Sequence, residues 1–165
     1  VTNLEAKEIS AEVNSLSSEI SVDDNAFLIL RMNNKARASI WVSSAATGGE
    51  NGLKIRVYGT KGAVEWFQDE PNHLKFTELN KSAKIITRAS NDVSDFSLKS
   101  SRLAAGHPEG FFEAFSNIYT EFADCILSNN KTNHTFPNIE DGVKGIKFIF
   151  AAKKSSNNNS KWEKI

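Results

Sequence analysis

Short runs of alternating apolar and polar residues fill the first half of the chain, and this period of two is typical of β-strands. Residues 26–32 have apolar side chains on both faces, so we expect this strand to be covered on both sides. Residues 36–42 alternate more regularly. The turn-forming residues 33–35 between these two runs predict an antiparallel hairpin.

A second hairpin is predicted where two further runs flank a glycine-bounded turn at residues 59–62. A loop precedes it at residues 48–52, which are rich in glycine and asparagine. The polar stretch 90–105 gives no clear pattern. The expected strands beyond the first hairpin are residues 4–13, 53–58, 63–67, 73–79 and 84–88.

Two helices are predicted near the end of the chain, because the apolar spacing there changes to three and four residues. Pro108 suits the first position of the earlier helix, and Glu109 suits the positive end of its dipole. The second helix is expected over 139–154. The side chains expected to face inward are Phe111, Phe115, Ile118, Tyr119, Phe122 and Ile126 in the first helix, and Val143, Ile146, Ile149 and Phe150 in the second.

Strands followed by helices predict an α+β fold, with an open, largely antiparallel sheet and helices packed on one face. The length of 165 residues fits a single domain over residues 1–165. Helices on one face leave the other face of strand 26–32 uncovered. A second copy of the chain is the expected cover, since large exposed apolar patches are rare on monomers.

The charge balance bears on the partners. Lys and Arg number 20, and Asp and Glu also number 20, so the chain lacks the basic excess that nucleic acids and anionic membranes attract. No apolar run approaches the ~20 residues of a membrane-spanning helix. The single cysteine, Cys125, favours a reducing compartment, and we expect a cytoplasmic protein. The start at Val1 suggests an excised or processed piece of a longer product.

Most motifs of catalysis and cofactor binding are missing from the sequence. It has no G-x-G-x-x-G fingerprint, P-loop, G-x-S-x-G elbow or H-E-x-x-H pair, and its three histidines lie far apart. We therefore expect neither a cofactor site nor a metal site in this chain. Asp23 and Asp24 have the chemistry to bind a cation or a hydroxyl-rich ligand, but a solvated turn before the strand is favoured.

His107 is the most interesting titratable residue, because it lies at a predicted helix N-terminus, where backbone N–H groups favour anions. An imidazole there can exchange a proton with a substrate hydroxyl. A loop histidine that only caps its helix is the alternative. Trp41, Trp66 and Trp162 have rings able to stack on a sugar, although packing in a core or an interface is commoner for Trp41 and Trp66, which lie on predicted strands.

Four blocks of the sequence stand out, namely Asn51-Gly52-Leu53 through Trp66, Gln68 through Leu74, Gly106-His107-Pro108-Glu109-Gly110-Phe111 with the helix that follows it, and Phe136-Pro137-Asn138 through Val143. These blocks resemble the C-terminal domain of the glucose–fructose oxidoreductase, inositol dehydrogenase and MocA (Gfo/Idh/MocA) family. They occur in the family's order with similar spacing, and the likeness extends from about residue 22 to Trp162.

The resemblance implies an NAD(P)-dependent dehydrogenase that acts on a sugar, a cyclitol or a related polyol. NAD or NADP would bind to an N-terminal Rossmann domain of the full-length protein, and this chain would be a domain of the type found in that family and in glyceraldehyde-3-phosphate dehydrogenase. The family's open sheet face often packs on a neighbouring subunit. Its catalytic D-x-x-x-H stretch and its E-K-P lysine precede the matched region, so no catalytic residue is assigned here and the isolated chain is expected to be inactive.

The candidate substrate-binding residues lie on loops, where a rigid sheet commonly presents its ligand-binding groups. Arg102, His107 and Glu109 precede the first predicted helix, and Glu50 and Asn51 belong to the glycine-rich loop. The alternative function is a non-catalytic module that dimerises or binds a small molecule without a Rossmann partner.

Overall fold

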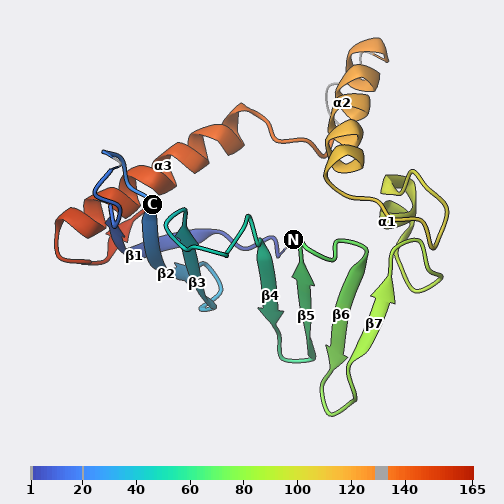
Figure 1. The fold of residues 1–165 in the computed structure, drawn as a ribbon, viewed down its shortest axis with the longest axis horizontal. Helices are drawn as coiled ribbons and strands as arrows, with labels where there is room; N and C mark the ends of the chain where they lie inside the picture. The colour runs from blue at the N-terminus through green and yellow to red at the C-terminus, as the bar shows by residue number, and fades with distance from the viewer. Residues whose placement is uncertain (1, 20, 129–133) are drawn as a thin grey trace. The chain divides into compact units, whose positions relative to one another are not determined.

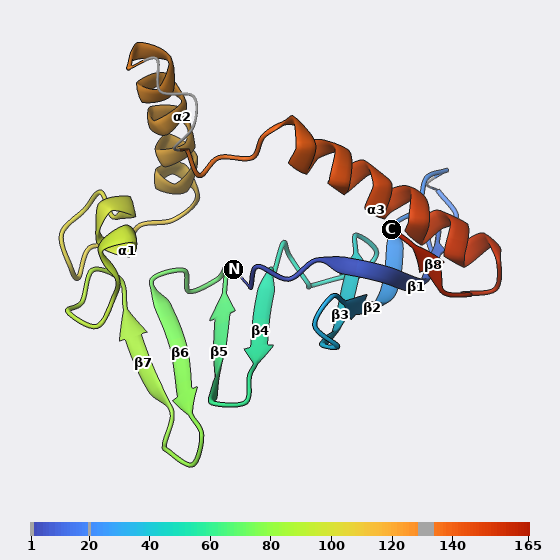
Figure 2. The same cartoon turned by 180° about the vertical axis from the view of Figure 1, so that it is seen from behind.

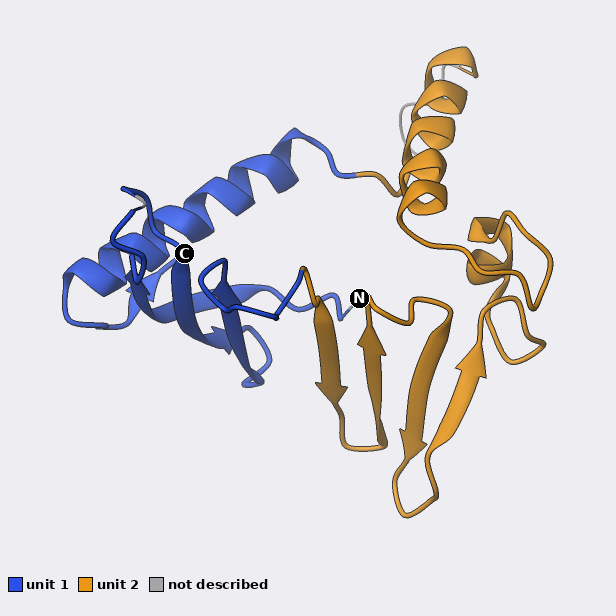
Figure 3. Ribbon diagram, viewed as in Figure 1, with its two compact units in different colours: residues 1–50, 137–165 blue, residues 51–136 orange. Residues whose placement is uncertain are grey.

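The structure is a computed structural model that describes residues 2–19, 21–128 and 134–165 (Figure 1). The chain divides into two compact units, Val1–Glu50 with Pro137–Ile165 and Asn51–Phe136 (Figure 3). In the described residues each unit contains one four-stranded sheet in which every pair of neighbours is antiparallel. The α+β fold class is therefore confirmed, and the strands form two sheets instead of one.

The first unit joins strands from both ends of the chain. Its sheet has the order β3-β2-β1-β8, and helix α3 packs along β1. Antiparallel pairing places Ile9 opposite Leu30, and Leu28 opposite both Ala11 and Ile40. The elements of this unit are β1 (Ala6–Asn14), β2 (Asn25–Met32), β3 (Arg37–Ser43), α3 (Ile139–Asn157) and β8 (Glu163–Lys164).

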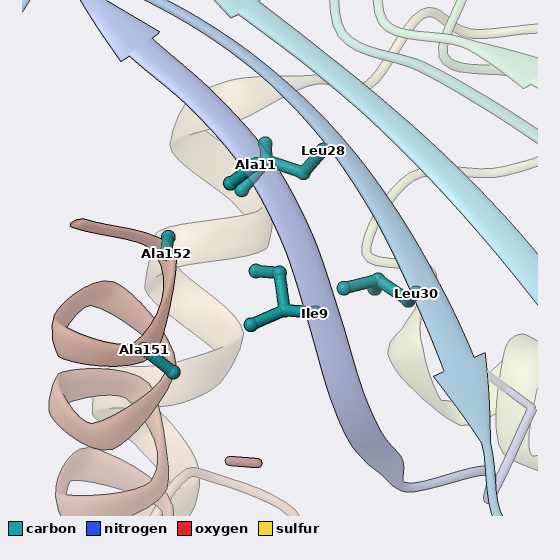
Figure 4. Packing of buried hydrophobic residues seen from close by; sticks show 6 residues of the cluster. All are labelled: Ile9, Ala11, Leu28, Leu30, Ala151 and Ala152. Atoms are coloured by element: carbon teal, nitrogen blue, oxygen red, sulfur yellow. The ribbon is translucent and has the colours of Figure 1, made fainter. Parts of the chain in front are cut away.

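The core of the first unit lies between this sheet and α3. Its members are small or aliphatic, and alanines on α3 let the helix approach the strands closely (Figure 4). Ser155 of α3 is completely buried, and its hydroxyl accepts from the Ala11 N–H at 2.9 Å and donates to the Lys161 carbonyl at 2.6 Å. The buried hydrophobic residues are Ile9, Ala11, Leu28, Leu30, Ala151 and Ala152.

The opposite face of the same sheet is apolar but exposed. Phe27, Ile29 and Trp41 are 52 %, 52 % and 61 % exposed. Phe27 and Trp41 stack in parallel with ring centroids 5.8 Å apart, and Asn25 accepts the indole N–H of Trp41 at 3.1 Å. Of the two apolar faces of strand 26–32, α3 covers one and the other is exposed in this chain, so the expected cover is present on one side only.

The second unit contains a meander in which strands that follow one another in the chain lie side by side (Figure 2). A glycine is required at Gly62, because a Cβ there would lie 2.5 Å from the Thr77 carbonyl oxygen on the next strand. None of the helices in the described part of the chain is long and apolar enough to cross a bilayer. The elements are β4 (Lys54–Tyr58), β5 (Gly62–Phe67), β6 (His73–Glu78), β7 (Lys84–Thr87), α1 (Asp95–Ser100) and α2 (Phe111–Leu127).

The start of α2 differs from the prediction. The helix begins at Phe111, so Pro108 and Glu109 precede it and do not occupy its first turn. Both backbone groups of Glu109 bond to the side chain of Asn72, which holds this residue outside the helix. The sequence also left α1 and the two-residue strand β8 unassigned, since each is too short to show a period.

The apolar faces predicted to lie inward on the helices are exposed in this chain, so that prediction is wrong for the chain by itself. On α2, Phe111 is 63 % and Tyr119 69 % exposed, and the apolar face expected to be buried on α3 is similarly open. The buried positions of α3 are instead Ala151, Ala152 and Ser155. Apolar periodicity identifies a face that needs cover, but it does not identify what supplies the cover.

Candidate functional site

The candidate site is the loop of residues 102–110, which precedes α2 in the second unit. Asn72 stands just before β6 and Arg88 just after β7. Since His73 pairs with Thr87 in antiparallel register, Asn72 and Arg88 face one another at the end of this strand pair, and the Arg88 N–H donates to the Asn72 carbonyl at 2.8 Å. The two side chains can therefore reach the same segment of the loop.

Asn72 binds the loop through the backbone of Glu109. Its Oδ1 accepts from the Glu109 N–H at 3.1 Å, and its Nδ2 donates to the Glu109 carbonyl at 2.9 Å. A side-chain amide has the same donor and acceptor as a peptide group, so it pairs with this backbone as a neighbouring strand would. Asn72 thus fixes the end of the loop next to α2.

Arg88 binds the middle of the loop. Nε donates to Asn72 Oδ1 at 2.9 Å, Nη1 donates to the Leu103 carbonyl at 2.9 Å, and Nη2 donates to the carbonyls of Ala104 at 3.2 Å and His107 at 2.5 Å. Nη1 also lies 3.3 Å from the Glu109 carboxylate. All three guanidinium nitrogens are therefore engaged by the protein.

Glu109 closes the loop on itself. Its carboxylate accepts from the Leu103 N–H and pairs with Arg88, and the side chains of Glu109 and Arg88 are only 7 % and 14 % exposed. Burying two charges costs free energy, and their attraction offsets this cost only when their other donors and acceptors are also hydrogen-bonded. Both partners meet this condition, because Arg88 also donates to backbone carbonyls and Glu109 also accepts from the Leu103 N–H.

His107 combines a fixed backbone with an exposed side chain. Its N–H donates to the Ala104 carbonyl at 3.2 Å, and its own carbonyl accepts from Arg88. Gly106 before it has a φ of 84°, a left-handed conformation that glycine adopts without strain. Within the described residues the imidazole has no hydrogen-bond or ion-pair partner, so its nitrogens are available to a ligand.

Arg102 anchors the beginning of the loop to α2. Its Nε donates to Asn117 Oδ1 and its Nη2 to Thr120 Oγ1, both at 2.7 Å. At the start of the same helix, the Glu113 carboxylate accepts from the Gly110 N–H at 2.8 Å. This hydrogen bond lowers the pKa of Glu113 from its ordinary value, and the positive charges of Arg102 and Arg88 lower it further.

The structure brings three of the five predicted site residues together in one loop, namely Arg102, His107 and Glu109. The other two, Glu50 and Asn51, are exposed and belong to different compact units. Glu50 has a left-handed φ of 46°.

Sequence reasoning missed Asn72 and Arg88 as residues of the site. Asn72 belongs to the block 68–74 that carries the family resemblance, and Arg88 is the last residue of the strand predicted over 84–88. Antiparallel pairing of 73–79 with 84–88 would have placed the two at one end of the hairpin. The pairing thus contained a signal for their proximity, but nothing in it pointed to the loop some fifteen residues further along.

The other candidates have structural partners. Asp24 is buried, and its carboxylate accepts from the N–H groups of Leu16 and Ser17 at 2.8 Å each, which lowers its pKa. This aspartate therefore stabilises a turn and is not solvated. The indole N–H of Trp66 donates to the Pro71 carbonyl at 3.1 Å. Across residues 2–19, 21–128 and 134–165, no group of three or more His, Cys, Asp or Glu side chains is arranged to hold a metal ion.

Comparison with known proteins agrees with the fold and the blocks described above. Residues 4–164 match the Gfo/Idh/MocA C-terminal family, described as "Oxidoreductase family, C-terminal alpha/beta domain". The chain belongs to this family. It is 31 % identical over 153 residues to an uncharacterized oxidoreductase, YfiI, of Bacillus subtilis, and the match covers 89 % of this chain and 39 % of that protein.

Solved structures of oxidoreductases have the same fold. A Sinorhizobium meliloti oxidoreductase is 39 % identical with a TM-score of 0.94, and the match covers 99 % of this chain and 48 % of that one. An inositol dehydrogenase homolog from Azotobacter vinelandii, complexed with NADH and myo-inositol, is 27 % identical with a TM-score of 0.92, covering 100 % of this chain and 45 % of that one. This chain thus spans less than half the length of these relatives.

Proposed function

We propose that this chain is the substrate-binding part of an NAD(P)-dependent oxidoreductase that acts on a sugar, a cyclitol or a related polyol. The observation that carries the proposal is the match along the whole chain to the inositol dehydrogenase homolog that was crystallised with NADH and myo-inositol. The exposed imidazole on a rigidly held loop supports it, because a polyol needs fixed hydrogen-bonding groups to orient its hydroxyls.

The residues of this chain do not fit a dinucleotide. Gly48-Gly49 and the pair Gly59 and Gly62 lack the G-x-G-x-x-G spacing, and no helix directly follows either. We therefore assign NAD or NADP to an N-terminal Rossmann domain of the longer protein, where the nicotinamide supplies the hydride acceptor. The part proposed for this chain is to bind and orient the polyol.

In this proposal His107 contacts the substrate. Its imidazole donates a hydrogen bond to a polyol hydroxyl or accepts one from it, depending on the tautomer. Arg102 and Glu109 are proposed to hold the loop that carries this contact, and Glu50 and Asn51 remain weaker candidates for substrate contacts. A site that hydrogen-bonds a hydroxyl discriminates against analogues that lack it, because its polar groups would then lose their partner.

The first test is an activity assay on the full-length protein. Reduction of NAD+ and of NADP+ is followed at 340 nm with myo-inositol, other cyclitols and aldoses, and a deoxy analogue serves as the control for each substrate. Reduction with at least one polyol and a weaker response to its deoxy analogue are expected. A protein that reduces neither cofactor with any of them would support the non-catalytic module instead.

The second test isolates His107. We expect His107→Ala to lower kcat/KM by roughly tenfold or more, the scale on which one lost substrate hydrogen bond acts. His107→Gln, which retains a donor and an acceptor, is expected to lose less. An unchanged kcat/KM in His107→Ala would show that the histidine serves only the loop before its helix.

A second copy of the chain is the proposed cover for the exposed face of the first unit's sheet. Phe27, Ile29 and Trp41 form an apolar strip on it, and a shallow hollow of about 390 Å3 lies over the same strands. Glu8 and Arg31 pair at 3.0 Å on this face, so charged groups flank the strip, as in the polar rim of an interface.

The single cysteine is compatible with the cytoplasmic location that we also propose.

A further inference from the structure

We propose that Arg88 is a positioning residue for polyol binding, and that its guanidinium holds the loop of residues 103–109 in the conformation that presents the His107 imidazole. The inference rests on the proposed function, since it assigns Arg88 a role in the same site. The sequence patterns assign this arginine no role.

The loop depends on a donor at its centre. The carbonyls of Leu103, Ala104 and His107 all point at the guanidinium of Arg88, at 2.9, 3.2 and 2.5 Å. Carbonyl oxygens that converge repel one another unless one group donates to all of them. The Arg88 side chain is only 14 % exposed, so the guanidinium is held against the loop although the three residues that it bonds are themselves exposed.

An arginine suits this position and a lysine does not. A guanidinium has five N–H donors in a fixed plane, and here they face Asn72, Glu109 and the three carbonyls. A lysine ammonium retains the charge but donates from a single atom, so it cannot span acceptors on both sides of the loop. Arg88→Lys therefore removes the donors that reach both sides of the loop, while it retains the positive charge that pairs with Glu109.

Arg88 acts on His107 through the backbone. The guanidinium bonds directly to the His107 carbonyl, and the ring beyond it has no partner in the described chain to set its direction. Because the nitrogens of Arg88 are already engaged, they are not free to bind the substrate. Binding groups must be held within about 0.5 Å of their productive positions. Relaxation of the loop would therefore weaken the hydrogen bond between the imidazole and the polyol.

A double-mutant cycle on the full-length protein tests this role. kcat/KM is measured for wild type, Arg88→Lys, His107→Ala and the double variant, with NAD+ and with NADP+ and with myo-inositol as the first polyol. Arg88→Lys is expected to lower kcat/KM about tenfold when His107 is present and less than about twofold in the His107→Ala background. Arg56→Lys, an exposed arginine of β4, is the matched control and is expected to change nothing.

The outcomes separate this inference from the proposed function. Equal losses in both backgrounds, or no loss when His107 is present, would overturn the role of Arg88 while the enzyme remained a polyol oxidoreductase. A wild type that oxidises no polyol would overturn both. If circular dichroism shows that Arg88→Lys does not fold, Glu109→Gln takes its place in the cycle, with a loss of at least about threefold expected only when His107 is present.

Discussion

Replacement of Ile9 by alanine tests the packing of the first unit. Ile9 is 0 % exposed and lies on β1 between two strand neighbours and helix α3 (Figure 4). Across the sheet it pairs with Leu30, and the alanines Ala151 and Ala152 of α3 belong to the same cluster. The backbones are already close at this point, so little material is available to fill the space that a truncated side chain leaves.

The expected cost follows from the atoms removed. Ile9→Ala deletes three carbons, and at about 0.8 kcal/mol for each buried carbon the transfer contribution is about 2.4 kcal/mol. A cavity adds to this, and such substitutions in cores cost about 2–5 kcal/mol in total. We therefore expect the free energy of unfolding to fall by about 3 kcal/mol, which corresponds to roughly 6–12 °C in Tm for a chain of this size.

Urea unfolding followed by far-UV circular dichroism measures this change. Ile29→Ala is the matched control, because Ile29 lies on the neighbouring strand with its side chain on the exposed face. At concentrations too low for self-association it is expected to cost less than about 1 kcal/mol. The packing argument would be refuted if Ile9→Ala cost less than about 1 kcal/mol, or if both variants cost the same.

Three further predictions follow from named contacts. The pKa of Glu113 is lowered in the folded protein, so its carboxylate stabilises the fold at pH values above the ordinary pKa of 4.5. Glu113→Gln should therefore destabilise the protein at pH 7. The difference in Tm between variant and wild type should shrink as the pH falls below 4.5. Ser155→Ala removes the partner of the buried Ala11 N–H and of the part-buried Lys161 carbonyl and should cost about 1–3 kcal/mol in urea unfolding, against less than about 0.5 kcal/mol for the exposed Ser39→Ala. Trp41→Ser should raise the dissociation constant of the dimer at least about tenfold in light scattering, and a wild type that is monomeric at every concentration would contradict the proposed interface.

The strands and helices are largely predictable from local pattern. The seven predicted strands are present with ends shifted by two residues or fewer, because successive side chains of a strand lie on opposite faces of its sheet and this alternation is visible in the sequence. The division into two sheets was not predictable, since both sheets are antiparallel and alternation does not say which strands are neighbours. Burial on α3 was predicted at the wrong positions, because Val143, Ile146, Ile149 and Phe150 are exposed while Ala151 and Ala152 are buried.

The contacts within the candidate loop were predictable only in part. His107 stood out because of its chemistry and its place before a helix, and the structure leaves its ring accessible. Glu109 was expected to act through the helix dipole, whereas its carboxylate is bound by Arg88 and the Leu103 N–H. Arg88 reaches acceptors fifteen to nineteen residues away, a relation set by tertiary structure that no local period encodes.

Transfer of deuterium tests the central claim most directly. The full-length protein is incubated with NAD+ or NADP+ and with a polyol deuterated at its carbinol carbons, and the reduced nicotinamide is analysed by mass spectrometry. If the protein is a polyol oxidoreductase, one deuterium appears at C4 of the nicotinamide, and less appears with the His107→Ala variant in the same time. Absence of deuterium from the nicotinamide with every polyol tried would contradict the account.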